Sequence, residues 1–100
     1  MGNRNVERVL FARPPLTDVP WAAWACMLLM AKAAHDDTQL YYGGIGWLQL
    51  QMGYADGPHG RRKIMRHLAT LEGAGYLRRT SKRHGHRVIY ELRLPAGFGR

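Results

Sequence analysis

The residue types with the clearest chemistry in this chain are the cations of its C-terminal two-fifths. One group occupies residues 61–66 and a second occupies residues 82–87. Guanidinium groups donate paired hydrogen bonds to phosphate oxygens or to O6 and N7 of guanine, and a lysine ammonium attracts phosphate as a point charge. The chemistry that these groups can do is therefore the binding of a polyanion. They are Arg61, Arg62, Lys63 and Arg66 in the first group, and Lys82, Arg83, His84, His86 and Arg87 in the second.

The charge of the chain is divided unevenly. The 100 residues carry a formal net charge of +8. Residues 1–60 hold four Arg or Lys against five Asp or Glu, a net −1, whereas residues 61–100 hold eleven against two, a net +9. A solvated surface needs charge but not charge of one sign, so this division favours a nucleic acid or an anionic membrane surface as the partner.

Length and composition limit the architecture. One hundred residues, 46% of them hydrophobic, predict a single domain with an ordinary core, which excludes disorder of the low-hydrophobicity kind. Cys26 is the only cysteine and cannot form an internal disulfide, and no charged-then-apolar leader opens the chain. We therefore expect an intracellular protein located in the cytoplasm.

Turn residues and apolar spacing indicate the elements that position the cations. Residues 19–34 are apolar at every position except Pro20 and Lys32, which predicts one strong helix. Thr17 or Asp18 can cap its start, with Pro20 in its first turn. At about sixteen residues the helix is shorter than the ~20 that a membrane span needs, so we expect a buried central helix and no membrane partner.

A second subunit is expected for two reasons. The first helix is apolar all round, and one partner surface does not cover such a cylinder. A domain of this size also buries little surface on DNA alone, so that two-fold pairing favours binding. The candidate contacts in a homodimer are Trp21, Trp24, Met27 or the N-terminal arm of residues 1–16.

Two further helices follow a short aromatic, strand-like run at residues 39–42. Residues 45–52 form a short helix that Gly53 ends, with apolar positions at Ile45, Leu48 and Met52. The next helix starts at Pro58, after a cap at Asp56 or Gly57, and continues to Gly73. Its buried stripe is Ile64, Leu68 and Leu71. The cations in its first two turns oppose the helix macrodipole, so local stability does not explain them and a bound phosphate does.

The last segment has the period of a β-hairpin. A strand begins at Leu77, and residues 81–87 form a basic loop with Gly85 at its tip. In the second strand one set of positions is predicted to face the core, in alternation with Ile89, Glu91 and Arg93. The core-facing positions are Val88, Tyr90, Leu92 and Leu94.

The order helix, short helix, basic helix and hairpin resembles the winged helix-turn-helix family. The stretch Leu68-Ala69-Thr70-Leu71-Glu72-Gly73-Ala74-Gly75-Tyr76-Leu77 is similar to the family's L-x-x-L-E-x-x-G-Y/L-L signature, and Arg87-Val88-Ile89-Tyr90-Glu91-Leu92 resembles its second wing strand. The resemblance covers residues 17–94, between an arm at 1–16 and a tail at 95–100. It implies an α+β fold in which three helices precede a two-stranded β-hairpin wing. Residues 28–48 look most like the variety found in phage and plasmid proteins.

This sequence departs from the family's pattern in two places. A small residue usually follows the first core leucine of the second helix, whereas Gln49 follows Leu48 here. The turn before Pro58 is also longer than the three or four residues of the motif. We therefore expect looser or shifted packing of the second helix on the third, which affects how Arg61 and Arg62 are presented.

The resemblance implies sequence-specific binding of double-stranded DNA by a transcriptional regulator of a mobile element or bacterial operon, on the bacterial nucleoid. Helix 58–73 is expected in the major groove, with base or phosphate contacts chiefly from Arg62, Lys63 and Arg66, and wing 81–87 on the backbone or minor groove. The expected DNA-binding residues are Arg61, Arg62, Lys63, Arg66, Thr70, Lys82, Arg83, His84 and Arg87. His84 and His86 add charge only when protonated.

Three other interpretations remain open from the sequence. The same fold can serve a plasmid or phage replication initiator or an excisionase-like architectural factor. It can also serve a protein-interaction adaptor that uses the apolar first helix. Finally, the cations can be an ordinary solvated face. Tandem direct repeats in a DNA footprint indicate a replication or architectural factor. A gel shift in which random DNA is not retarded indicates an adaptor.

Enzyme and metal chemistry lack the necessary residues. The basic segment offers only Glu72 and Glu91 as carboxylates, on a helix end and on a strand, and no nucleophile with a base. The His84-x-His86 pair has no accompanying cysteine. We therefore expect no enzymatic activity, no metal site and no cofactor.

Overall fold

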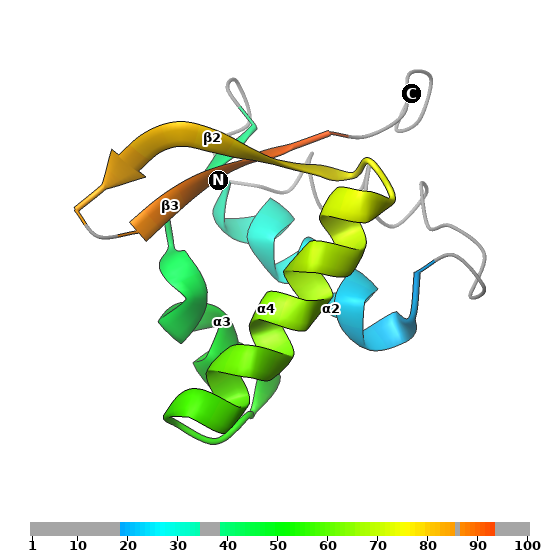
Figure 1. Cartoon of the computed structure of the whole chain (residues 1–100), viewed down its shortest axis with the longest axis vertical. Helices are drawn as coiled ribbons and strands as arrows, with labels where there is room; N and C mark the ends of the chain where they lie inside the picture. The colour runs from blue at the N-terminus through cyan, green and yellow to red at the C-terminus, as the bar shows by residue number, and fades with distance from the viewer. Residues whose placement is uncertain (1–18, 35–38, 86, 94–100) are drawn as a thin grey trace.

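Three helices and a three-stranded antiparallel sheet make an α+β fold in the computed structural model (Figure 1). The structure describes residues 19–34, 39–85 and 87–93; the arm and the tail expected at the two ends, and the caps Thr17 and Asp18, lie outside these ranges. The elements in chain order are α2 (Trp21–Ala33), β1 (Leu40–Tyr41), α3 (Gly44–Met52), α4 (Pro58–Gly73), β2 (Leu77–His84) and β3 (Arg87–Leu92).

Helix α2 is the central core element, packed against α4, α3 and β1. It begins two residues later than predicted, because Pro20 is its N-cap and accepts the Trp24 N–H at 3.0 Å. Trp24 and Met27 are 1% and 0% exposed, so the prediction that they remain available for a second subunit is wrong. Trp21 is 55% exposed. Trp24 and Met27 are buried because α4, α3 and the sheet together surround the apolar helix α2, which one surface alone would not cover.

The turn between α3 and α4 is held by a buried glutamine. The prediction that Gly53 ends α3 is confirmed, since this residue is left-handed with φ of 71°. Gln49, only 7% exposed, donates from Nε2 to the carbonyl oxygens of Ala55 at 3.2 Å and Gly57 at 3.3 Å. A Cβ at Gly60 would overlap the Ala55 carbonyl oxygen. The turn is thus packed closely over the first turn of α4, and the Gln49 side chain is hydrogen-bonded to it.

Helix α4 follows the predicted pattern. Its N-cap is Gly57 and Pro58 is its first residue. Its buried positions, Gly60 and the predicted stripe Ile64, Leu68 and Leu71, face α2 and α3. Just after α4 the ring of Tyr76 meets that of Trp24 edge-on, with centroids 5.2 Å apart. These contacts fix α4 along its length, so its opposite face is presented to solvent.

The sheet has one strand more than the predicted hairpin. Its order is β1-β3-β2, and the strand-like run at residues 39–42 supplies β1, with Leu40 opposite Glu91 and Tyr41 opposite Tyr90. The added strand pairs backbone groups that a two-stranded hairpin would leave open on the outer edge of β3. The buried Tyr41 also donates its hydroxyl to the Gly44 carbonyl at 2.7 Å, so β1 fixes the start of α3.

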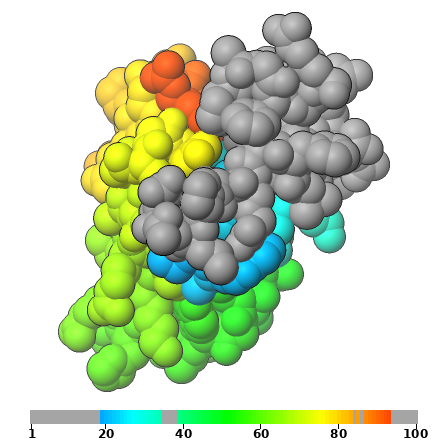
Figure 2. All heavy atoms as spheres, turned by 90° about the vertical axis from the view of Figure 1, so that its right-hand side faces the viewer, coloured from blue at the N-terminus to red at the C-terminus, as the bar shows by residue number. Residues whose placement is uncertain are grey.

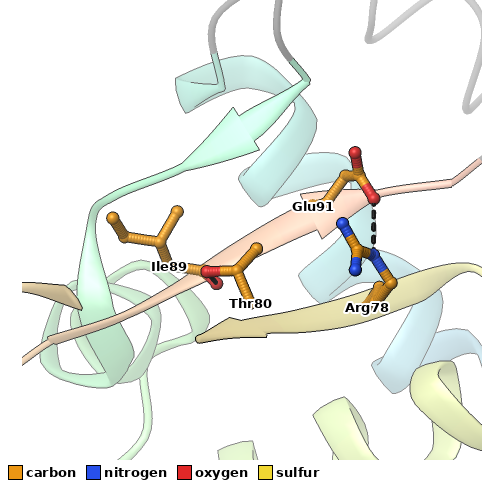
Figure 3. Close-up of polar contacts among 4 residues, drawn as sticks. All are labelled: Arg78, Thr80, Ile89 and Glu91. Atoms are coloured by element: carbon orange, nitrogen blue, oxygen red, sulfur yellow. Dashed lines mark hydrogen bonds and ion pairs between the residues drawn. The ribbon is translucent and has the colours of Figure 1, made fainter. Parts of the chain in front are cut away.

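The hairpin of β2 and β3 is longer than predicted, because residues 81–84 belong to β2 instead of a loop. Between Arg79 and Arg83, β2 advances by four residues while β3 advances by two, from Tyr90 to Val88. This bulge is bridged by Thr80, whose Oγ1 donates to the Ile89 carbonyl at 2.7 Å (Figure 3). Strand pairing therefore continues almost to Gly85 and carries the basic residues with it.

Seen from the side, α3 and the start of α4 (green) make up one end of the molecule, and the end of α4 (yellow) lies beside the β2–β3 hairpin (orange) toward the other (Figure 2). Among the described residues, no helix has the length and apolar character needed to cross a bilayer.

Candidate nucleic-acid interface

The first cationic group lies on the exposed side of α4. We call this group of four exposed cations the basic face of α4: Arg61, Arg62, Lys63 and Arg66. Ile64, which follows Lys63, is fully buried. The first turn of α4 contains no acidic residue. Uncompensated positive charge at a helix N-terminus is unfavourable, so the helix macrodipole does not explain the cations at the start of α4.

Both acidic residues of the C-terminal segment are used elsewhere. Glu91 accepts from Arg78 Nε at 2.8 Å on the outer face of the sheet (Figure 3), and Glu72 accepts from Arg79 at 3.3 Å. These exposed pairs contribute little stability. Because residues 61–100 contain only these two carboxylates, no acid of that segment neutralises the basic face.

Thr70, another predicted contact, lies one turn beyond Arg66 and is half-buried. Its hydroxyl donates to the Arg66 carbonyl at 3.0 Å. This bond uses the hydroxyl proton within α4, so Thr70 has no free donor for a phosphate.

A tyrosine–histidine pair supports the basic face from behind and was missed by the sequence analysis. The hydroxyl of Tyr54 lies 2.9 Å from Nε2 of His67, and Nζ of Lys63 lies 5.1 Å from the centre of the Tyr54 ring. Burial, Arg66 and Lys63 together lower the pKa of His67 below its usual value. The neutral imidazole can then accept the Tyr54 O–H at Nε2. Only the spacing of Lys63 and His67 was visible in the sequence, because Tyr54 comes from the preceding turn.

The second cationic group is divided between the two sides of the sheet. Residues opposite each other on paired strands share a face, so Arg83 lies on the same side as Val88. Lys82 instead borders a hollow of about 210 Å³ with Arg78 and Thr80. The structure therefore does not bring Lys82 to Arg83. Of His84 only the backbone is described, and residue 86 lies outside the described residues.

One residue of the first group and two of the second border one pocket. Arg61 from α4, Arg83 from β2 and Arg87 from β3 border a cavity of about 380 Å³ beside the start of α3. The other walls come from the Gly43–Trp47 segment, Val88 and Tyr90. We call this cavity the arginine pocket. It is lined both by the start of α4 and by the hairpin, which their separation in sequence does not reveal.

The described residues offer little for other chemistry. Among them, no three His, Cys, Asp or Glu side chains cluster as ligands of a metal ion would. Burial raises the pKa of the Cys26 thiol to about 12, which keeps it protonated and unreactive. Comparison of the chain with protein-family models, with curated proteins and with solved structures finds no match.

Proposed function

We propose that this chain is a sequence-specific, double-stranded DNA-binding protein of the winged helix-turn-helix class and a transcriptional regulator of a mobile element or bacterial operon. The observation that carries the proposal is the arginine pocket: Arg61 of α4 and Arg83 and Arg87 of the hairpin lie around one cavity. One cation of the helix and two of the hairpin therefore lie around one cavity, which supports simultaneous contact of α4 and the hairpin with one duplex.

The dimensions of α4 suit a major groove. An α-helix rises ~1.5 Å per residue, so Arg62 and Arg66 lie ~6 Å apart along the axis, close to two base-pair steps. Each guanidinium can donate two bonds to a guanine, and a correct pair discriminates by ~1–3 kcal/mol. In this arrangement Lys63 reaches a phosphate, and the hairpin lies over the neighbouring backbone or minor groove.

The adaptor interpretation receives less support. It requires an apolar α2 surface for a partner protein, yet the large side chains Trp24, Met27 and Met30 are buried inside the molecule. Two-fold pairing stays part of the proposal, through a surface that excludes Trp24 and Met27. A footprint over one short palindrome supports a regulator, whereas tandem direct repeats support replication or attachment-site work.

The proposal is tested by DNA binding of charge-matched variants. A duplex selected from random sequence with the wild-type chain is titrated by fluorescence anisotropy at several salt concentrations. We expect affinity to fall steeply with salt, and Arg62→Ala with Arg66→Ala to lose roughly 100-fold or more, at ~10-fold or more per lost base contact.

The control removes two exposed cations that lie outside both cationic groups, Lys32→Ala with Arg93→Ala. This variant has the same net charge as the test variant and should retain most of the affinity. Equal affinity of the Arg62, Arg66 variant and the wild type, with both folded, contradicts the proposal.

A further inference from the structure

The arginine pocket concentrates positive charge that the fold itself does not neutralise. Its three arginines come from three different elements, and in the described part of the chain none of the three forms an ion pair. Like charges gathered at one cavity repel one another unless an anion lies between them. We propose that the arginine pocket binds a phosphate group.

The floor of the pocket is built from backbone. The stem of Arg87 lies over Gly44, where an added Cβ would be 2.9 Å from Arg87 Cδ. Gly44 also has φ of +77°, a conformation that side chains disfavour. At Gly43 an added Cβ would overlap the Tyr41 ring. Glycine at both positions therefore leaves room for the Tyr41 ring and the Arg87 stem to pack against the start of α3, which places Arg87 at the cavity.

The backbone that carries Arg83 and Arg87 is fixed by contacts already described. Tyr41 is buried, and its hydroxyl bond to the Gly44 carbonyl holds the pocket floor on the sheet. The β2 bulge keeps Arg83 on the same side of the sheet as Val88, another lining residue. A site whose donors stand on a helix and two paired strands is preorganised for its ligand.

Phosphate is the anion that matches these donors best. Guanidinium groups are planar forks that bind phosphate oxygens in pairs, and three forks around one cavity can satisfy a tetrahedral group from several sides. The volume of about 380 Å³ falls within the ~300–1,000 Å³ typical of small-ligand sites, and Trp47 and Val88 add apolar wall beside the charge. The phosphate can thus belong to a free phosphorylated compound or to a DNA backbone.

If the bound group is a free phosphate, the inference goes beyond the proposed function. If it is a phosphate of the DNA backbone, the inference rests on the proposed function. Two arms of one experiment separate these sources. The first follows the backbone amides of Gly43, Gly44 and Gly46 and the Trp47 indole N–H by NMR while inorganic pyrophosphate is added to the full chain. Sodium chloride of equal ionic strength is the reference titration.

In the first arm we expect saturable shifts at these four groups with pyrophosphate and not with chloride. Arg87→Gln should weaken the apparent affinity at least tenfold, and Arg93→Gln, an exposed arginine outside the pocket lining, should leave it unchanged. If Arg87→Gln fails to fold, Arg83→Gln takes its place.

The second arm replaces one backbone phosphate at a time in the selected duplex by a neutral methylphosphonate. A backbone phosphate in the pocket predicts one position whose replacement weakens the wild type but not the Arg83→Gln variant. Saturation by pyrophosphate supports a free phosphate, and the coupled position supports DNA. The absence of both responses would overturn the inference. If the chain still bound the duplex tightly in that case, the proposed function would stand.

Discussion

The side-chain amide of Gln49 donates a hydrogen bond to the carbonyl oxygen of Gly57, 3.3 Å away, and so ties the middle of α3 to the N-cap of α4. A second bond from the same nitrogen reaches the Ala55 carbonyl. The first turn of α4, which carries Arg61 and Arg62, is thereby held against α3. Gln49, which departs from the winged helix-turn-helix pattern that the sequence resembles, thus helps to set the presentation of the basic face.

Replacing this glutamine should loosen that attachment. In Gln49→Leu the Ala55 carbonyl loses its side-chain donor and the Gly57 carbonyl keeps only the Arg61 N–H, and each lost hydrogen bond costs ~0.5–1.5 kcal/mol. We expect a loss of that size in the free energy of unfolding, measured with urea, together with weaker duplex binding. Gln51→Leu, at an exposed position of the same helix, is the control and should change little. Equal stabilities of the two variants would show that the Gln49 bonds do not hold the turn.

Gly60 tests the close packing of the turn on α4. A Cβ there would overlap the Ala55 carbonyl oxygen, so Gly60→Ala should destabilise the chain by roughly 1–3 kcal/mol, the usual cost of overpacking. At Gly73, in the last turn of the same helix, a Cβ meets no atom within 4 Å. Gly73→Ala should be neutral or slightly stabilising, because alanine favours helix. Thermal unfolding distinguishes the two, and a Gly60→Ala variant as stable as Gly73→Ala would refute the close contact.

The pH dependence of stability should report on His67. Its pKa is lowered in the folded chain, chiefly by burial and then by Arg66 and Lys63, from the ordinary value of 6.5. The unfolded chain therefore binds more protons between the two pKa values, so stability is complete above about pH 6.5 and falls as the pH drops toward the folded value. Urea unfolding at pH 7.5 and 5 should show a larger acid loss for wild type than for His67→Gln. Identical losses would exclude this role.

We expect an exposed methionine on α4 to contact a thymine base. Met65 is 47% exposed and lies one position from Arg66 within the run of cations. Apolar side chains in the major groove contact the thymine C5-methyl group. If α4 reads the groove, replacing thymine by deoxyuridine at one position of the selected site should weaken the wild type about tenfold, consistent with ~1–3 kcal/mol per base. Met65→Ala should lose this preference. If the deoxyuridine replacement weakens binding of the wild type and of Met65→Ala equally, Met65 does not contact that thymine methyl group.

Much of the helical part could be predicted because the residues that start and end its helices act locally. Gly53 and Pro58 mark where α3 ends and α4 begins, and the stripe of Ile64, Leu68 and Leu71 identifies the buried side. The start of α2 differed because the Pro20 carbonyl serves as the cap. Nothing within a short window distinguishes that arrangement from a proline inside the first turn.

The sheet and the pocket depend on contacts between distant residues. Residues 81–84 are polar and lack an alternating pattern, yet pairing with β3 makes them strand. Leu40 and Tyr41 become an edge strand only because residues fifty positions later accept them. The same long-range pairing brings Arg83 and Arg87 to Gly44, and no local spacing encodes it. The cations were therefore identifiable from the sequence, whereas their arrangement around one cavity was not.

The proposed function requires α4 and the hairpin to contact one duplex together. Backbone amide shifts of the full chain, followed during titration with the selected duplex, test it most directly. We expect the amide signals of residues 61–66 on α4, Gly44 and Arg83 to shift in parallel at the same DNA ratio, while those of Lys32 and Arg78 stay unchanged. Perturbation confined to the outer face of the sheet around Arg78, with α4 unaffected, would contradict it.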